Sequence, residues 1–172
     1  MHLPRVYVQA NAKINLTLDV LGKRQDGYHN IRSVMQSISL NDRISLTKTP
    51  GNISVHCGNP KVPCNSDNLV CRAALALKEA TGVTSGVHIE LRKGIPVAAG
   101  LGGGSADAAA VLRGLNVLWN TGLNDNELRQ IGKNIGADVP FCLMGGTALA
   151  EGIGEILTPL KPLPRMYLVL FK

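Results

Sequence analysis

The chain has 172 residues, 45% of them hydrophobic and 17% charged, which excludes a disordered protein and suits one globular domain, or one large and one incomplete domain. The formal net charge of +6 indicates an anionic partner, but aromatic residues make up only 3%, and single-stranded nucleic acid needs aromatic stacking platforms. A polyphosphate substrate satisfies the charge without nucleic acid. No apolar run is long enough to cross a bilayer and no signal peptide is recognisable, so we expect a soluble, cytoplasmic protein without a membrane partner.

The four cysteines, at positions 57, 64, 71 and 142, do not form a metal-binding pattern. No Cys-x-x-Cys pair occurs, and the spacings match none of the zinc motifs. We therefore predict reduced, mostly buried thiols and no metal site in the protein.

Two half-buried strands are predicted at the N-terminus, over residues 5–10 and 14–21, because apolar and polar residues alternate there. Lys13 lies one step before the second strand, and the alternation places it on the same face as Asn15 and Thr17. By itself, a lysine in such a position is commonly a solvated strand residue.

A turn follows over residues 22–30, with its tightest point at Asp26 and Gly27. It places Tyr28 and His29 side by side at the start of the next strand, pointing to opposite faces. An aromatic ring and an imidazole can stack on and hydrogen-bond a planar base, or they can be ordinary surface residues. Further strands are expected at about 31–40, 43–48 and 53–57.

A helix is predicted over about 68–81, capped by Ser66 or Asp67 and closed by Gly82. Asn68 stands at its start, where its amide either contacts a ligand or is an ordinary helix-end residue. Another alternating strand is expected at 86–93.

The stretch after this strand, Pro-Val-Ala-Ala-Gly-Leu-Gly-Gly-Gly-Ser-Ala at 96–106, is the most distinctive of the chain. Its glycines permit positive φ and expose backbone N–H groups, and a helix expected at about 105–119 would direct its positive dipole end at the same place, which suits phosphate. The pattern is not a Walker loop, because no Gly-Lys-Ser/Thr follows. It is not a Rossmann fingerprint either, because Ser105 stands where that pattern requires its third glycine. A tight turn that only permits close packing is the alternative. Ser105 itself is either a helix N-cap or a hydroxyl that reaches a nucleotide-bound Mg²⁺.

The last third begins with a capping box, Asn124 to Glu127, which predicts a helix to about 135 that Gly136 ends in the left-handed conformation. Asp138 then either caps the next turn or has another role, and Pro140 keeps Val139 extended or occupies the first turn of a new helix. Further strands are expected at 142–151, 155–157 and 167–171.

Several of these segments together resemble the GHMP kinases, over nearly the whole chain. They are Ala-Lys-Ile-Asn-Leu at 12–16, Lys-Arg-Gln-Asp-Gly-Tyr-His at 23–29, the glycine loop, Gly-Ala-Asp-Val-Pro-Phe at 136–141 and the segment 150–159. The resemblance implies an α+β fold of the ribosomal protein S5 domain 2-like type, a mostly antiparallel sheet with helices on one side. It further implies an N-terminal ATP-binding domain over residues 1–160, with 161–172 as the start of a C-terminal domain that family members carry and that is otherwise absent here.

The resemblance also implies an alcohol kinase with ATP as co-substrate and nucleotide-bound Mg²⁺, acting on a small molecule, a cytidylated sugar alcohol. Asp138 matches the general base that accepts the proton of the substrate hydroxyl, and Lys13 matches its catalytic partner. Tyr28 and His29 match the pair that binds the cytosine, and Asn15 lies next to the reacting hydroxyl. ATP binding is assigned to Asn68, Lys93, Pro96, Val97, Ala98, Ala99, Gly100, Leu101, Gly102, Gly103, Gly104, Ser105 and Ala106.

Two other functions stay open at this point. One is a GHMP kinase for another small alcohol, which would not need a base-binding pair at Tyr28 and His29. The other is a nucleotide-binding or nucleic-acid-binding module without turnover, prompted by the positive charge and by a chain that ends before the C-terminal domain. The oligomeric state and any protein ligand of Mg²⁺ are likewise open.

Overall fold

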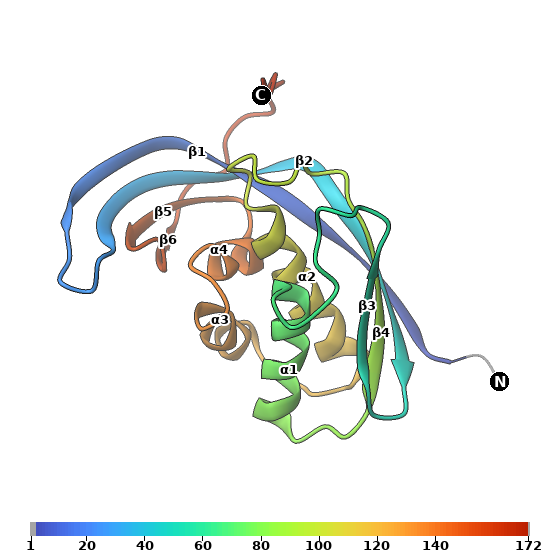
Figure 1. Ribbon diagram of the computed structural model, residues 1–172. Helices are drawn as coiled ribbons and strands as arrows, with labels where there is room; N and C mark the ends of the chain where they lie inside the picture. The colour runs from blue at the N-terminus through green and yellow to red at the C-terminus, as the bar shows by residue number, and fades with distance from the viewer. Residues whose placement is uncertain (1–2, 172) are drawn as a thin grey trace.

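The computed structural model describes residues 3–171, which form a mixed six-stranded sheet with all helices packed on one of its faces (Figure 1). The predicted α+β architecture is therefore confirmed. In chain order the elements are β1 (Arg5–Lys23), β2 (His29–Thr49), β3 (Ile53–Cys57), α1 (Leu69–Thr81), β4 (Gly86–Arg92), α2 (Gly103–Leu118), α3 (Asp125–Lys133), α4 (Val139–Met144), β5 (Thr147–Gly152) and β6 (Ile156–Pro159).

Strand β2 is the centre of the sheet. One of its edges pairs with β1 in an antiparallel hairpin along most of its length. Its other edge is divided, because residues 31–36 pair with β5 and residues 43–49 pair with β4, both antiparallel. Beyond these, β6 pairs antiparallel with β5, and β3 pairs parallel with β4. The sheet is thus mostly antiparallel, as predicted.

The first two strands are longer than the sequence indicates. The two segments expected at 5–10 and 14–21 are one strand with register shifts, the first of them between Asn11 and Lys13. The break expected at residues 41–42 is also absent, because the side chain of Asp42 is buried and accepts hydrogen bonds from the backbone of Gly94 and Ile95. A residue pair of turn composition is held extended here by tertiary contacts.

Two of the N-cap assignments considered from the sequence are wrong. The side chain of Asn68, not Ser66 or Asp67, caps α1 by accepting from Val70 N. Helix α2 begins at Gly103 behind a left-handed Gly102, so Ser105 is not its N-cap.

The closing glycine of α1 and the capping box of α3 are confirmed, since Gly82 has φ 67° and the Asn124 and Glu127 side chains bond each other's backbone. Gly136, however, is not among the positive-φ residues, and α3 ends at Lys133 with a right-handed Asn134. The chain therefore leaves α3 without the left-handed residue that the sequence suggested.

The C-terminal third differs most from expectation. Residues 142–144 belong to α4, with Pro140 in its first turn as one of the two alternatives had it, and the strand begins only at Thr147. The strand expected at 155–157 is confirmed as β6. The apolar segment 167–171 forms no strand, because within residues 3–171 it has no partner strand, and a strand needs a partner.

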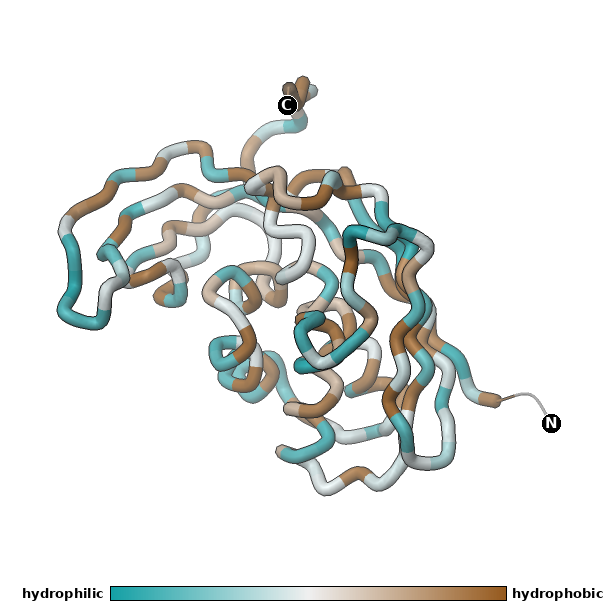
Figure 2. Tube along the Cα trace, in the orientation of Figure 1, coloured by the Kyte–Doolittle hydropathy of each residue, from teal (hydrophilic) through white to brown (hydrophobic). Residues whose placement is uncertain are grey.

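The main hydrophobic core lies between the sheet and helices α1 and α2, and most residues of α2 are buried. Hydrophobic positions recur along the strands and helices that enclose this core (Figure 2). Helix α2 approaches β2 so closely that a Cβ at Gly114 would collide with Leu46. A smaller second cluster, Met35, Phe141, Ala148 and Ala150, joins α4 to β2 and β5. Together the two clusters hold α4 against α2 and against strands β2 and β5.

The cysteines are unpaired, as predicted, but they are not mostly buried: Cys64 is exposed and the other three are half-buried. Within the described residues, no helix combines the length and apolar character needed to cross a membrane.

Candidate active site

Lys13 and Asp138, which are 125 positions apart in the numbering, form an ion pair, with 3.2 Å between Lys13 Nζ and Asp138 Oδ2. The lysine comes from β1 and the aspartate from the residue before α4. The lysine side chain is 9% exposed and the aspartate side chain 29%, so the carboxylate can be reached from solvent while the ammonium is held in place.

The register shift in β1 explains why Lys13 points inward. Ala10 is buried and Asn11 exposed, as in a regular strand, but Ala12 and Lys13 are both buried in succession. A bulge re-aims a side chain in this way, and bulges are frequent beside active sites. The interpretation of Lys13 as a solvated strand residue is therefore wrong.

Asp138 occupies the N-cap position of α4 but does not act as a cap. Its φ and ψ of −84° and −11° are right-handed, and its side chain makes no hydrogen bond to the helix. The carboxylate faces Lys13 instead. Cys142, one turn further, has its thiol pKa raised to about 12 by burial and then by Asp138, so it stays protonated and neutral beside the ion pair.

Asn15 orients the lysine. Its Oδ1 accepts a hydrogen bond from Lys13 Nζ at 2.8 Å, and its Nδ2 donates to Ser33 Oγ at 2.6 Å. Ser33 is fully buried and donates in turn to the carbonyl of Thr17. The expected common face of Lys13 and Asn15 is confirmed, whereas nothing in the sequence distinguishes Ser33 from other strand serines.

The glycine loop closes against this pair. Lys13 N donates to Leu101 O at 3.0 Å, and a Cβ at Gly102 would lie 2.8 Å from Lys13 Cγ. Gly102 has φ 68°, so only glycine fits there without strain. The loop thus lies directly beside the lysine.

A cavity of about 280 Å³ lies over this loop. Its lining comprises Lys61, Val62, Pro63, Asp67, Asn68, Leu69, Lys93, residues 96–104 and Asp107. The sequence-predicted loop residues from Pro96 to Gly104 therefore share one hollow with Asn68 and Lys93, and the N-terminus of α2 opens beneath it. Ser105 and Ala106 follow in α2, and Ser105 Oγ faces Gly136, 3.7 Å from the position of a Cβ there.

Asn68 and Lys93 line the cavity, but both have structural partners. Asn68 Oδ1 accepts from Val70 N at 3.0 Å, and its Nδ2 donates to Pro63 O at 2.6 Å. Lys93 Nζ lies 2.5 Å from Asp42 Oδ2 and 2.7 Å from Asp107 Oδ2. Their roles toward a nucleotide remain predictions.

The sequence reasoning missed the two acidic partners of Lys93. Asp42 is fully buried and Asp107 is 3% exposed. Burial raises the pKa of Asp107 to about 8, and the negative charge of Asp42 acts in the same direction. The positive charge of Lys93 opposes this shift. The two carboxylates raise the pKa of Lys93 although burial opposes this. The sequence signal that could have found this cluster is Asp107, a single acidic residue in an alanine-rich helix that is expected to be buried. A buried acidic side chain needs a partner.

Tyr28 and His29 lie at the end of the β1–β2 hairpin, which projects beyond the helices at the left of Figure 1. Both are exposed, and Tyr28 N donates to Asp26 Oδ1 at 3.1 Å within the turn. Among the described residues, neither side chain bonds the Lys13–Asp138 pair. Base binding by the two residues remains a prediction.

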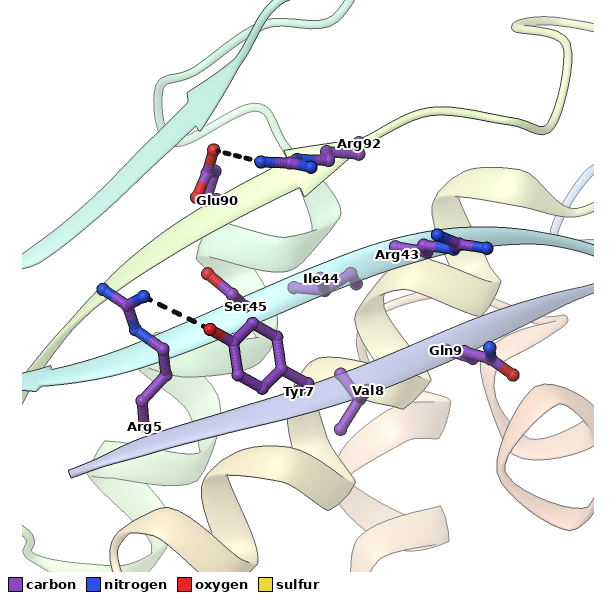
Figure 3. A pocket seen from close by; sticks show the side chains of 9 residues that line it. All are labelled: Arg5, Tyr7, Val8, Gln9, Arg43, Ile44, Ser45, Glu90 and Arg92. Carbon is purple, nitrogen blue, oxygen red and sulfur yellow. Dashed lines mark hydrogen bonds and ion pairs between the residues drawn. The ribbon is translucent and has the colours of Figure 1, made fainter.

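A larger cavity, of about 660 Å³, lies elsewhere, on the strand face turned away from the helices (Figure 3). Four of its polar side chains pair with one another, since Arg5 donates to Tyr7 at 3.3 Å and Arg92 meets Glu90 at 3.6 Å. None of the sequence-predicted site residues lines it. We therefore assign the candidate site to the smaller cavity at the glycine loop.

Comparisons with known sequences show which proteins this chain is similar to. Residues 68–146 match the family described as GHMP kinases N terminal domain. The 4-diphosphocytidyl-2-C-methyl-D-erythritol kinase of Acetivibrio thermocellus is 52% identical over 167 residues, which cover 97% of this chain and 59% of the relative. The enzyme of the same name from Pelotomaculum thermopropionicum is 56% identical over 164 residues, which cover 95% of this chain and 57% of that relative. The chain thus spans less than two thirds of the length of these relatives.

Solved structures give the same picture. A crystal structure of 4-(cytidine 5'-diphospho)-2C-methyl-D-erythritol kinase has 42% sequence identity and a TM-score of 0.74, over 90% of this chain and 55% of that chain. The mevalonate kinase of Methanococcus jannaschii has a TM-score of 0.71 at 15% sequence identity, over 92% of this chain and 56% of that chain. At this identity the match supports the fold alone.

Proposed function

Because the chain belongs to the GHMP kinases through its N-terminal domain, we propose that it transfers the γ-phosphoryl group of ATP to the 2-hydroxyl of 4-diphosphocytidyl-2-C-methyl-D-erythritol, a step in non-mevalonate isoprenoid precursor biosynthesis. The observation that carries the proposal is the Lys13–Asp138 pair at 3.2 Å, beside a glycine loop that opens into a cavity. Phosphoryl transfer needs this combination of a base, a cation and a phosphate cradle.

In the proposed reaction the 2-hydroxyl oxygen attacks the γ-phosphorus, the bond to the bridging oxygen breaks, and ADP leaves. Asp138 Oδ accepts the hydroxyl proton. Lys13 stabilises the negative charge that develops on the attacking and transferring oxygens. Asn15 holds the lysine in position through its 2.8 Å hydrogen bond.

The glycine loop suits the triphosphate of ATP. Backbone N–H groups of the loop and of the first turn of α2 offer donors without side chains in the way, since a Cβ at Gly100 would meet nothing within 4 Å. Mg²⁺ would neutralise phosphate charge. In this proposal the ion arrives with the nucleotide, and Ser105 is the hydroxyl assigned to contact it.

The same proposal assigns Tyr28 and His29 to the cytosine of the substrate, by ring stacking and hydrogen bonding. It also divides the chain into an ATP-binding domain, residues 1–160, and the start of a second domain after it. The exposure of Tyr167 and Val169, 91% and 92%, supports this division, because large apolar side chains in solvent usually have a partner surface.

A coupled assay of ADP release from the purified chain tests the function, with the cytidylated alcohol and the same sugar alcohol phosphate without its cytidyl group as acceptors. We expect release with the cytidylated acceptor only, and its loss in Lys13→Met. In Tyr28→Ala, KM for this acceptor should rise while ATP affinity stays unchanged.

Each of the other outcomes would assign a different function to this protein. ADP release with the uncytidylated acceptor would indicate a kinase for another alcohol. Tight ATP binding without release on either acceptor would indicate a nucleotide-binding module, and salt-sensitive binding to oligonucleotides without ATP preference would indicate a nucleic-acid-binding module.

A further inference from the structure

Three titratable residues with buried side chains, Asp42, Lys93 and Asp107, lie beneath the glycine loop and come from three different parts of the chain. Asp42 belongs to β2, Lys93 directly follows β4, and Asp107 lies in the second turn of α2. Lys93 Nζ bridges the two carboxylates at 2.5 Å and 2.7 Å. A Cβ at Gly103 would lie 3.4 Å from that nitrogen, so the ammonium lies against the end of the loop.

The first carboxylate holds the entry to the loop. Asp42 Oδ1 accepts from Gly94 N at 2.6 Å and from Ile95 N at 2.8 Å, while its other oxygen accepts from Lys93. Hydrogen bonds to an ionised acceptor are stronger than neutral ones, particularly where water is excluded. Residues 94 and 95 are therefore tied to the central strand of the sheet.

The second carboxylate holds the exit. Asp107 lies in α2, which begins at Gly103 with the last glycines of the loop, and its Oδ2 bonds Lys93. Its Oδ1 is buried and, within residues 3–171, has no hydrogen-bond partner. A buried carboxyl group with one oxygen unpaired costs folding free energy, so a stabilising role alone accounts poorly for it.

From these contacts we infer that Asp42, Lys93 and Asp107 are positioning residues, which clamp both ends of the glycine loop so that its N–H groups are preorganised for a triphosphate. The inference rests on the proposed function for its ligand. It gives Lys93 the task of orienting the loop through two carboxylates, in addition to any contact of its third proton with the nucleotide. A loop shifted by about 1 Å can lose on the order of 100-fold in kcat/KM, which makes such a clamp consequential.

Asp107→Ala and Asp107→Asn, compared in the nucleotide-free chain and in ATP kinetics, test the inference. In Asp107→Ala the clamp loses its exit contact, so amide exchange over residues 96–102 should quicken about 10-fold or more, as expected for a lost charged hydrogen bond. KM for ATP should rise by a comparable factor. Asp107→Asn keeps an oxygen that accepts from Lys93 and should restore both readouts. Asp125→Ala, which removes an exposed acid of α3, is the matched control.

Unchanged loop exchange and unchanged KM for ATP in a folded Asp107→Ala would overturn the clamp. If that variant does not fold, the double change Lys93→Met with Asp107→Leu removes two of the three titratable groups at similar volume, while Asp42 keeps its backbone hydrogen bonds from Gly94 and Ile95, and the same two readouts apply. Should the wild-type chain bind no ATP, the proposed function fails, but the exchange comparison still decides whether the clamp holds the loop.

Discussion

At the scale of single residues, Asp138 carries the proposed chemistry. Its backbone occupies a cap position, yet its side chain leaves the helix uncapped and pairs with Lys13. Replacement by Asn keeps the shape and removes the base, so kcat of phosphoryl transfer should fall roughly 10²- to 10⁴-fold while the ATP dissociation constant is unchanged. Steady-state kinetics and calorimetry check this, with Asp125→Asn as control. Near-normal kcat in Asp138→Asn would remove the residue from the mechanism.

Asp107 should give the folding stability a pH dependence of its own. Its pKa is raised, mainly by burial, from 3.8 to about 8, so the folded state holds a proton that the unfolded state releases. The contribution of this proton to the free energy of unfolding is complete below pH 4, declines as the pH rises, and is lost above about pH 8. The other charges facing the carboxyl are Lys93 and Asp42, and the Cys142 thiol behind it stays neutral.

Urea unfolding of wild type and Asp107→Asn at pH 5, 7 and 9 isolates this effect, because all other groups titrate in both proteins. The unfolding free energy of the wild type should fall relative to the variant between pH 5 and pH 9. A constant difference across this range would show that Asp107 is ionised throughout.

Lys13 and Asp138 could be proposed as a pair from the sequence, because each stands in a recognisable motif and the resemblance implies that they act together, but the geometry of their contact could not. That geometry depends on a bulge that turns Lys13 inward and on a helix start at which the Asp138 side chain makes no capping hydrogen bond. The partners of Lys93 carried no such motif. Asp42 and Asp107 lie 51 and 14 positions from it, and only the folded sheet and α2 bring them together.

At the scale of elements, α2 depends on close approach to the sheet. A Cβ at Gly114 would collide with Leu46 and lie 3.1 Å from Val8 Cγ1. Gly114→Ala should therefore lower the unfolding free energy by about 1–3 kcal/mol, although alanine favours helix by about 1 kcal/mol. Gly104→Ala in the same helix meets only Leu69, at 3.4 Å, and should not destabilise. Denaturant unfolding of both variants measures the contrast, and equal stabilities would refute the tight packing.

Periodicity located most elements but misjudged where pairing stops. It divided β1 and β2, since a bulge and a buried Asp42 look like turns in a linear sequence. Conversely, the apolar run at 167–171 predicted a strand where no neighbouring strand lies within the described residues. Local pattern states which conformation a segment can adopt, whereas its partners decide whether it does.

At the scale of the whole molecule, two clusters hold the fold together, and the last residues join neither. The main core binds α1 and α2 to the sheet, and the second binds α4 across β2 and β5. The site lies where these parts meet, since Lys13 follows the buried Ala12 and Asp138 precedes α4. Rigid support on both sides keeps the ion pair at its distance.

Stability should accordingly be indifferent to the exposed end of the chain. Val169 and Phe171 are 92% and 101% exposed, so changing both to Ser should alter the unfolding free energy by less than about 0.5 kcal/mol. Val87→Ser, at a fully buried position of β4, should cost about 2–4 kcal/mol, because it removes apolar contacts and buries a hydroxyl. Urea unfolding of the two variants gives both values. A loss above about 1 kcal/mol in the Val169 and Phe171 variant would mean that the segment packs on the domain in solution.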